Sequence, residues 1–288
     1  DGLYGIWLTG DYHTVTNCDV WNWRATGAYV STDVPIGIYV GGDWNTVSAT
    51  RVRNFVNTVH TPATGPLGFA VVVDSGHDAT VSNCQFSESG VQIDNQCYRC
   101  VVSDNIIVGL PNTADQYPMV YVGGEAHSIS ITGNNIDCGN SARSGIYVIG
   151  GDGPYAHNIL IDSNTIVAIR AHSDPDVPSG AIVFSGRVSD WTISNNKVDG
   201  WRNVGDPNVR GIFIRLSLVL PGVVPNGGQI HGNSVINCIS GIICWGYSTL
   251  PQQRLKNIDI NDNHISNCAQ PVTVDGGGIV VNGVGTPD

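Results

Sequence analysis

The chain reads ITGNNI at residues 131–136, IDSNTI at 161–166 and ISNNKV at 193–198, three copies of one pattern, apolar–x–x–Asn–x–apolar. Six more segments follow or approximate this pattern: VTNCDV (15–20), VSATRV (47–52), VSNCQF (81–86), VSDNII (102–107), IHGNSV (230–235) and INDNHI (260–265). The copies recur with a mean period of about 30 residues, and a fixed period of this size indicates a repeat architecture.

A second motif, small–apolar–x–apolar, precedes each copy. It reads GIWL (5–8), GIYV (37–40), VVVD (71–74), GVQI (90–93), MVYV (119–122), GIYV (145–148), AIVF (181–184), GIFI (211–214) and GIIC (241–244), and GIVV (278–281) follows the last copy. Apolar residues alternate with period two, which predicts strands, and the intervening Gly, Asn, Asp and Ser predict turns. Each copy is too short to bury its own apolar face, so successive copies must stack as parallel strands.

Chain chirality favours a right-handed coil for strands connected in this way. The sequence therefore predicts an all-β fold, a single-stranded right-handed parallel β-helix of about nine to ten rungs, with residues 1–288 forming one domain. We expect GIVV (278–281) to open the tenth rung. Neither end carries the polar cap that terminal repeats need, so we expect the domain to be excised from a longer chain.

The fourth position of the first motif forms a column of asparagines. Its members are Asn105, Asn134, Asn164, Asn196, Asn233 and Asn263, and the first three copies carry Cys18, Thr50 and Cys84 there. Asn tolerates the left-handed backbone of a tight turn, and stacked Asn side chains can hydrogen-bond along a column. This column resembles the asparagine ladder of the right-handed parallel β-helix (pectate-lyase-like) superfamily, and the resemblance covers nearly the whole chain.

Composition excludes several classes of protein. Only 13% of the residues are charged, and the chain is rich in Val and Ile, so we expect a folded chain rather than a disordered one. The net charge is −11, with Lys197 and Lys256 as the only lysines, which argues against a sequence-independent nucleic-acid binder. No apolar run approaches 18 residues, so we expect no membrane span.

The chain has eight cysteines, which we interpret mainly as small buried hydrophobic residues of a reduced protein. Cys238 and Cys268 occupy equivalent places in neighbouring rungs and are candidates for a disulfide. Cys97 and Cys100 form a CxxC motif with no companion pair, a weak zinc or redox signal. No Asn-x-Ser/Thr sequon is present, and a protein that folds in a bacterial cytoplasm and is exported later, as a virion part is, fits both observations.

The outward column of the first strand predicts a binding groove. It reads Trp7, Tyr39, Val72, Gln92, Tyr121, Tyr147, Val183, Phe213, Ile243 and Val280, and aromatic faces in its first half suit stacking on sugar rings. The next outward column reads Thr9, Gly41, Asp74, Asp94, Gly123, Ile149, Ser185, Arg215, Trp245 and Asn282. The alternative is a stripe covered by loops or by a neighbouring subunit.

The second outward column places Asp74 and Asp94 on adjacent rungs, with carboxylates roughly 5 Å apart, which suits the acid and the nucleophile of a retaining glycosidase. A short loop at Ser87–Ser89, between long loops at 21–36 and 53–68 on one side and 167–180 and 199–210 on the other, predicts a cleft over rungs 3 to 5. Two solvated turn aspartates, or a cation site, are the alternative.

Further candidate substrate-binding residues surround this pair. Gln92, Tyr121 and Tyr147 belong to the groove, and a third column holds His77, Tyr98, His127 and His157. Stacked imidazoles can shuttle protons or bind ligands, although polar aromatics also fill turns. Arg170 begins RAHSDPD (170–176), which is similar to the Asp-Pro-His-Asp site of alginate C5-epimerases, but Asp176 stands where that family has His.

The resemblance implies a carbohydrate-active protein, and we expect the shaft of a phage tailspike that hydrolyses a bacterial surface polysaccharide, extracellular or on the virion surface. Such shafts are commonly trimers, so a homotrimer or larger assembly is expected. Asp74 and Asp94 are the expected catalytic pair, with Gln92, Tyr121, Tyr147, His77, His127 and Arg170 binding substrate, and no metal or cofactor is expected. A non-catalytic glycan-binding or structural rod is the main alternative, and a polysaccharide lyase or uronan epimerase is the third.

Overall fold

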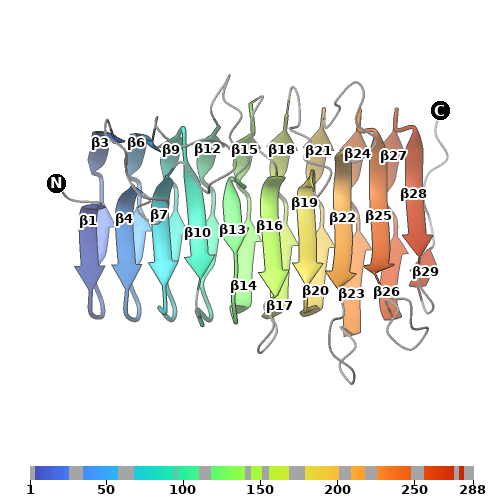
Figure 1. Ribbon diagram of the computed structural model, residues 1–288, viewed down its shortest axis with the longest axis horizontal. Helices are drawn as coiled ribbons and strands as arrows, with labels where there is room; N and C mark the ends of the chain where they lie inside the picture. Colours follow the sequence, from blue (N-terminus) through green and yellow to red (C-terminus); the bar gives the residue numbers. More distant parts are fainter. Residues whose placement is uncertain are drawn as a thin grey trace.

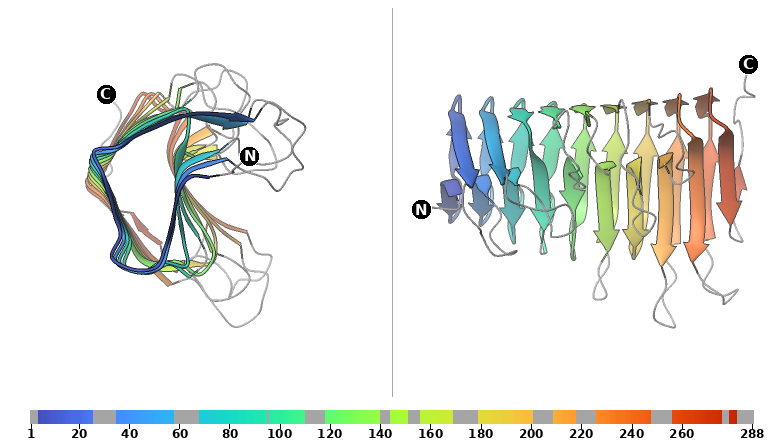
Figure 2. Two further views of the ribbon diagram at one scale, coloured as in Figure 1. Left: turned by 90° about the vertical axis from the view of Figure 1, so that its left-hand side faces the viewer. Right: turned by 45° about the horizontal axis from the view of Figure 1, so that its top comes forward.

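The chain coils into a rod built from three parallel sheets (Figure 1). The computed structural model describes residues 4–25, 35–57, 68–94, 96–109, 118–139, 144–150, 156–168, 179–200, 209–217, 226–247, 256–275 and 279–281. Within these residues every element is a strand, and no helix is long and apolar enough to cross a membrane. Viewed along the rod, the strands of successive turns superimpose, as expected of a β-helix (Figure 2).

The three sheets are called A, B and C in the order in which each turn of the coil visits them. Sheet A contains β1 (Tyr4–Thr9), β4 (Ile36–Gly41), β7 (Phe69–Asp74), β10 (Gly90–Asp94), β13 (Val120–Val122), β16 (Ser144–Gly150), β19 (Ser179–Gly186), β22 (Val209–Ser217), β25 (Ser240–Tyr247) and β28 (Gln270–Asp275). Sheet B contains β2 (Thr14–Thr16), β5 (Thr46–Ser48), β8 (Thr80–Ser82), β11 (Val101–Ser103), β14 (His127–Thr132), β17 (Ala156–Asp162), β20 (Val188–Ser194), β23 (Asn226–His231), β26 (Lys256–Asn261) and β29 (Ile279–Val281). Sheet C contains β3 (Asp19–Ala25), β6 (Arg51–Asn57), β9 (Gln85–Ser87), β12 (Ile106–Val108), β15 (Asn135–Asp137), β18 (Thr165–Val167), β21 (Lys197–Asp199), β24 (Ser234–Ile236) and β27 (His264–Ser266).

One continuous apolar core fills the coil. Inward residues such as Ile93, Ile146 and Ile182 are fully buried, and they alternate with outward residues along each strand. Full burial of a side chain of this size contributes roughly 1.5–3 kcal/mol. The predicted period-two alternation and the stacking of copies are therefore confirmed.

The asparagine ladder is present in the corner between sheets B and C. Asn164 is typical: its Nδ2 donates to Oδ1 of Asn196 at 3.0 Å and to the carbonyl of Ile131 at 2.9 Å. Its Oδ1 accepts from the backbone N–H and the Nδ2 of Asn134 at 3.0 and 2.9 Å. Each ladder residue thus satisfies buried polar groups of its neighbours, as buried polar groups require.

The left-handed residue of this corner is the one before the asparagine, which corrects the sequence interpretation. Asp104 has φ 56°, Ser163 φ 57° and Asn195 φ 54°, whereas the ladder asparagines have no positive φ. The ladder side chain must point inward to bond its neighbours, so the preceding residue makes the reversal.

The last turn also differs from the prediction. β28 (Gln270–Asp275) opens the tenth turn in sheet A, and the GIVV segment contributes β29 to sheet B, where it pairs with β26. Only three residues separate β27 from β28, so the chain enters sheet A at once. The two outward columns therefore end at Thr273 and Asp275 instead of Val280 and Asn282.

Two of the predicted loops, 21–36 and 53–68, begin as strands. β3 extends to Ala25 and β6 to Asn57, and the two pair in parallel as far as these residues.

All eight cysteines carry free thiols, including Cys238 and Cys268. Cys97 and Cys100 are buried, and the described residues contain no cluster of three His, Cys, Asp or Glu side chains placed to hold a metal.

Candidate functional site

The first outward column of sheet A has the predicted register from Trp7 to Ile243. Its two halves differ in exposure. Val183, Phe213 and Ile243 are buried and Tyr147 packs against them, whereas Trp7 is 56% exposed. Tyr39, Gln92 and Tyr121 are half-buried. The accessible part of the column therefore lies over its first half.

The second outward column brings Asp74 and Asp94 together. They are direct partners at the ends of β7 and β10, and both are half-buried. Oδ2 of Asp74 accepts from the hydroxyl of Tyr39 at 2.9 Å, and Oδ1 accepts from the hydroxyl of Ser75 at 3.2 Å. Oδ2 of Asp94 accepts from Nε2 of Gln92 at 2.7 Å. Two carboxylates with different hydrogen-bond donors thus share one face of the sheet.

Glycines make room for the tyrosines beside this pair. In the same column, Gly41 precedes Asp74 and Gly123 follows Asp94, each two residues after a tyrosine. A Cβ on Gly123 would lie 2.5 Å from Cε1 of Tyr121, and one on Gly41 would lie 3.3 Å from Cε1 of Tyr39. Each tyrosine ring therefore lies over its glycine, next to an aspartate of the same column.

The hydroxyl of Tyr39 is protonated when it donates to Asp74. Its partial burial, followed by its hydrogen bond to Asp74 and then the negative charge of that carboxylate, raises the pKa of Tyr39 to about 12. The phenol therefore stays protonated at neutral pH and donates to the carboxylate. Tyr4 and Trp7 contact its ring, with centroids 5.5 and 5.3 Å away, which holds Tyr39 in place.

The third predicted column is a stack of rings, in which His77 and Tyr98 precede strands of sheet B, His127 begins β14 and His157 lies in β17. Tyr98 stacks on His127 at 5.1 Å, and His127 stacks on His157 at 4.7 Å. His77 lies next to Tyr98 and contacts Oδ1 of Asp43 through Nδ1 at 2.8 Å. Burial and then the neighbouring imidazole of His157 lower the pKa of His127. His77 and Tyr98 follow β7 and β10, the strands that end in Asp74 and Asp94.

The remaining predictions for the site fall on other parts of the chain. Arg170 lies outside the described residues, as do most residues of the four long loops expected to wall the cleft. The short connection at Ser87–Ser89 is confirmed, since β9 ends at Ser87 and β10 begins at Gly90.

Sequence reasoning did not assign roles to Tyr39 and Asp43. Tyr39 was visible as a member of the aromatic column, and its spacing to Gly41 repeats in Tyr121 and Gly123. That repeated Tyr-x-Gly spacing is the signal that finds it. Asp43 lies in GDWNTV (42–47), which repeats GDYHTV (10–15), but that repeat does not indicate the contact with His77 in the next turn.

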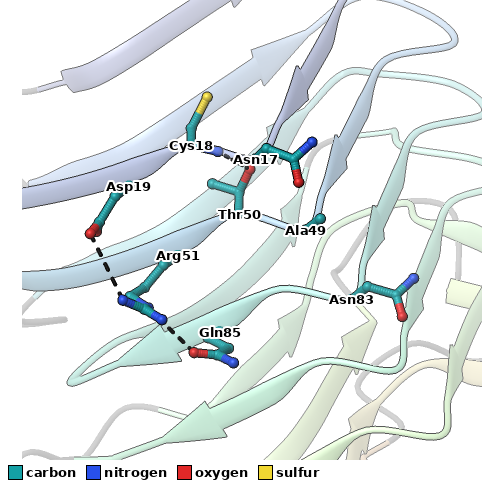
Figure 3. A pocket seen from close by; sticks show the side chains of 8 residues that line it. All are labelled: Asn17, Cys18, Asp19, Ala49, Thr50, Arg51, Asn83 and Gln85. Carbon is teal, nitrogen blue, oxygen red and sulfur yellow. Dashed lines mark hydrogen bonds and ion pairs between the residues drawn. The ribbon is translucent and has the colours of Figure 1, made fainter.

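A separate hollow lies at the corner between sheets B and C (Figure 3). It has a volume of about 360 Å³ and is lined by Asn17, Cys18, Asp19, Ala49, Thr50, Arg51, Asn83 and Gln85. None of these residues belongs to the sheet that carries Asp74 and Asp94.

Comparison with known proteins identifies the architecture. Residues 69–255 match the family model described as a right handed beta helix region. No curated protein sequence matches the chain.

Three solved structures have similar folds. A DFA-IIIase from Arthrobacter chlorophenolicus in complex with GF2 is 12% identical, with a TM-score of 0.52 over 96% of this chain and 63% of that one. A mutant tailspike protein of the E. coli bacteriophage HK620 in complex with a pentasaccharide is 16% identical, with a TM-score of 0.52 over 88% and 43%. A hyperthermoactive exopolygalacturonase from Thermotoga maritima is 10% identical, with a TM-score of 0.51 over 87% and 73%. The chain thus spans less than two thirds of the DFA-IIIase chain, and identities this low show likeness of fold.

Proposed function

Since the chain belongs to the right-handed β-helix family, we propose that it is a carbohydrate-active enzyme that hydrolyses a polysaccharide on the outer face of sheet A. The observation that carries this proposal is the direct pairing of Asp74 and Asp94 on adjacent strands, each with its own hydrogen-bond donor. A pair of carboxylates is the usual machinery of glycoside hydrolysis.

The donors suggest the role of each carboxylate. Asp74 accepts two hydroxyl hydrogen bonds, from Tyr39 and Ser75, and such donors stabilise a carboxylate ion. Asp74 is therefore the nucleophile that attacks the anomeric carbon. Asp94 gives its proton to the glycosidic oxygen, so the leaving sugar departs as an alcohol. Asp94 then takes a proton from the water that hydrolyses the glycosyl ester on Asp74.

Aromatic rings on both sides of the pair supply sugar-binding surfaces. Tyr121 and Tyr147 lie on β13 and β16, the next two strands of sheet A after the strand of Asp94, and their rings stack with centroids 6.1 Å apart. Trp7 and Tyr39 lie on β1 and β4, the two strands before that of Asp74. Apolar faces of sugar rings stack on such side chains while their hydroxyls bond to the phenols. Gln92, His77, His127 and Arg170 complete the proposed substrate contacts.

We place the substrate on a bacterial surface and the protein in a phage tailspike, outside the cell or on the virion, as a homotrimer or larger assembly. Support comes from the likeness in fold to the HK620 tailspike, which was solved with a pentasaccharide. The acidic net charge of −11 and the absence of sequons are compatible with that setting.

The test is an activity screen against bacterial capsular polysaccharides and exopolysaccharides, with wild type beside Asp74→Asn and Asp94→Asn. Reducing ends and the ultraviolet absorbance of unsaturated sugars are followed together. Asp104→Asn is the matched control, because Asp104 is an exposed carboxylate in a left-handed turn position that asparagine also accepts. New reducing ends that both site variants lose and the control keeps support a hydrolase.

Other outcomes identify the alternatives. Absorbance of unsaturated products would make the protein a lyase and remove the nucleophile role of Asp74. Changed uronate configuration without cleavage would make it an epimerase. Binding without any turnover would favour a glycan-binding or structural rod. The observation that favours such a rod is that half of the outward column, around Phe213, is buried.

A further inference from the structure

In the hollow between sheets B and C, a small residue stands in a row of longer side chains. Asn17, Ala49 and Asn83 occupy equivalent left-handed positions in the first three turns, with φ of 54°, 48° and 55°. The two asparagines are exposed, Ala49 between them carries only a methyl group, and all three line the hollow (Figure 3).

Charged side chains form one wall of the hollow. Arg51 lies across the turns, with Nη1 3.9 Å from Oδ2 of Asp19 and Nε donating to Oε1 of Gln85 at 3.3 Å (Figure 3). Arg53, two residues further along the same face, donates from Nη2 to Oδ2 of Asp19 at 2.9 Å and from Nε to Oδ1 at 3.3 Å. Two guanidinium groups therefore share one carboxylate, which leaves this patch net positive on a chain of charge −11.

These guanidinium groups still reach solvent. The side chains of Arg51 and Arg53 are 51% and 41% exposed. A guanidinium carries five N–H donors, and the contacts with Asp19 and Gln85 use only part of them within the described residues. The remaining donors are suited to a second carboxylate, which arginine binds through paired hydrogen bonds.

An exposed indole completes the surface. Trp21 follows Asp19 on the outer face of β3, is 57% exposed, and has the guanidinium of Arg53 5.5 Å from its ring centroid. An aromatic face beside amides and cations is the combination that binds a sugar ring bearing an acidic group.

We propose that this hollow, together with Arg53 and Trp21 on the adjoining outer face of sheet C, is a binding site for an acidic saccharide unit, separate from the aspartate pair on sheet A. The carboxylate of the sugar pairs with Arg51 and Arg53, its ring stacks on Trp21, and its hydroxyls bond to Asn17, Asn83 and Gln85. The volume of about 360 Å³ lies within the range of small-molecule sites, ~300–1,000 Å³. The site stands whether or not the aspartate pair is catalytic.

The test is calorimetric titration of the full chain with a galacturonate trimer, a hyaluronan tetrasaccharide and sialyllactose, beside neutral maltotriose. We expect at least one acidic probe to bind and maltotriose not to bind. Arg53→Gln and Trp21→Ala are expected to weaken that binding about tenfold, because each removes a direct contact. Lys197→Gln, which removes a positive charge elsewhere on the same outer face, should leave Kd within about twofold.

Substitutions of Ala49 separate filling of the hollow from disruption of the fold. Ala49→Asn fills the space with a side chain that the left-handed backbone accepts, so binding is lost while the melting temperature is kept or raised. Ala49→Gly also suits this backbone but fills nothing, and it should bind as the wild type does.

We expect the Asp74→Asn variant to bind the acidic probe with the wild-type Kd. That result would distinguish this site from the proposed active site. The proposal is overturned if no acidic probe binds the wild type, if maltotriose binds equally well, or if Ala49→Asn binds with unchanged Kd.

Discussion

The hydroxyl of Tyr39 donates a 2.9 Å hydrogen bond to Oδ2 of Asp74, although the two residues lie 35 positions apart. The contact joins neighbouring turns of the coil and crosses the space above Gly41. It links the aromatic column to the carboxylate column, so the two predicted columns of sheet A are joined by a side-chain contact.

The first prediction concerns the ionisation of Tyr39. Since the pKa of Tyr39 is about 12 in the folded protein and about 10 in an unfolded chain, the native state keeps this proton between those values. The unfolded state binds fewer protons there, so this group lowers the free energy of unfolding as pH rises from about 10 to 12.

The measurement is a phenolate absorbance titration of wild type and Tyr39→Phe. Their difference is expected to show one phenol with a midpoint near pH 12. A midpoint near 10 would contradict the contact with Asp74. Tyr39→Phe should also reduce kcat/KM about tenfold, the effect of one hydrogen bond to a charged group.

The second prediction concerns the space beside Tyr121. Gly123→Ala places a methyl group 2.5 Å from the ring, so Tyr121 must swing away from the carboxylate column. Because the displaced atoms end a side chain, the melting temperature should change little while kcat/KM falls about tenfold. Gly41→Ala, with a contact of 3.3 Å, should have a smaller effect. Equal losses for the two variants would argue against steric displacement.

The third prediction is stereochemical. Neighbouring strands lie about 4.8 Å apart, which is close to the ~5–5.5 Å between the two carboxyl groups of retaining glycosidases and shorter than the ~6.5–9.5 Å of inverting ones. Hydrolysis should therefore retain the anomeric configuration. Proton NMR of the first-formed product distinguishes the anomers, and inversion would require a different carboxylate pair.

The fourth prediction tests the ladder. Asn164→Ala removes the Oδ1 acceptor of Asn134 and the donor to Asn196, leaving buried polar groups unsatisfied. The expected loss in the free energy of unfolding is about 3 kcal/mol, seen as a lower denaturant midpoint. Asn135→Ala is the control, because Asn135 is exposed and should change stability by less than about 0.5 kcal/mol. Similar losses in both would show that the ladder is not the source.

The pairing of Asp74 with Asp94 was predictable from the sequence, and so was the register of sheet A from Trp7 to Ile243. Both follow from counting residues within motifs that repeat at one spacing. The same counting failed at the end of the chain. There, Gln270–Asp275 lacks the motif and yet pairs with β25.

By itself, the sequence determined the repeat, the inward and outward faces and the asparagine column, because each depends only on spacing along the chain. The tertiary structure alone decided that Tyr39 bonds Asp74, that His77 meets Asp43, and that Ala49 leaves a hollow beside Arg51. These contacts join different turns and depend on side-chain direction and on the space left by Gly41 or Ala49. The repeat places these residues on the outer face of the coil, but it does not give the rotamer of each side chain or the shape of the space around it.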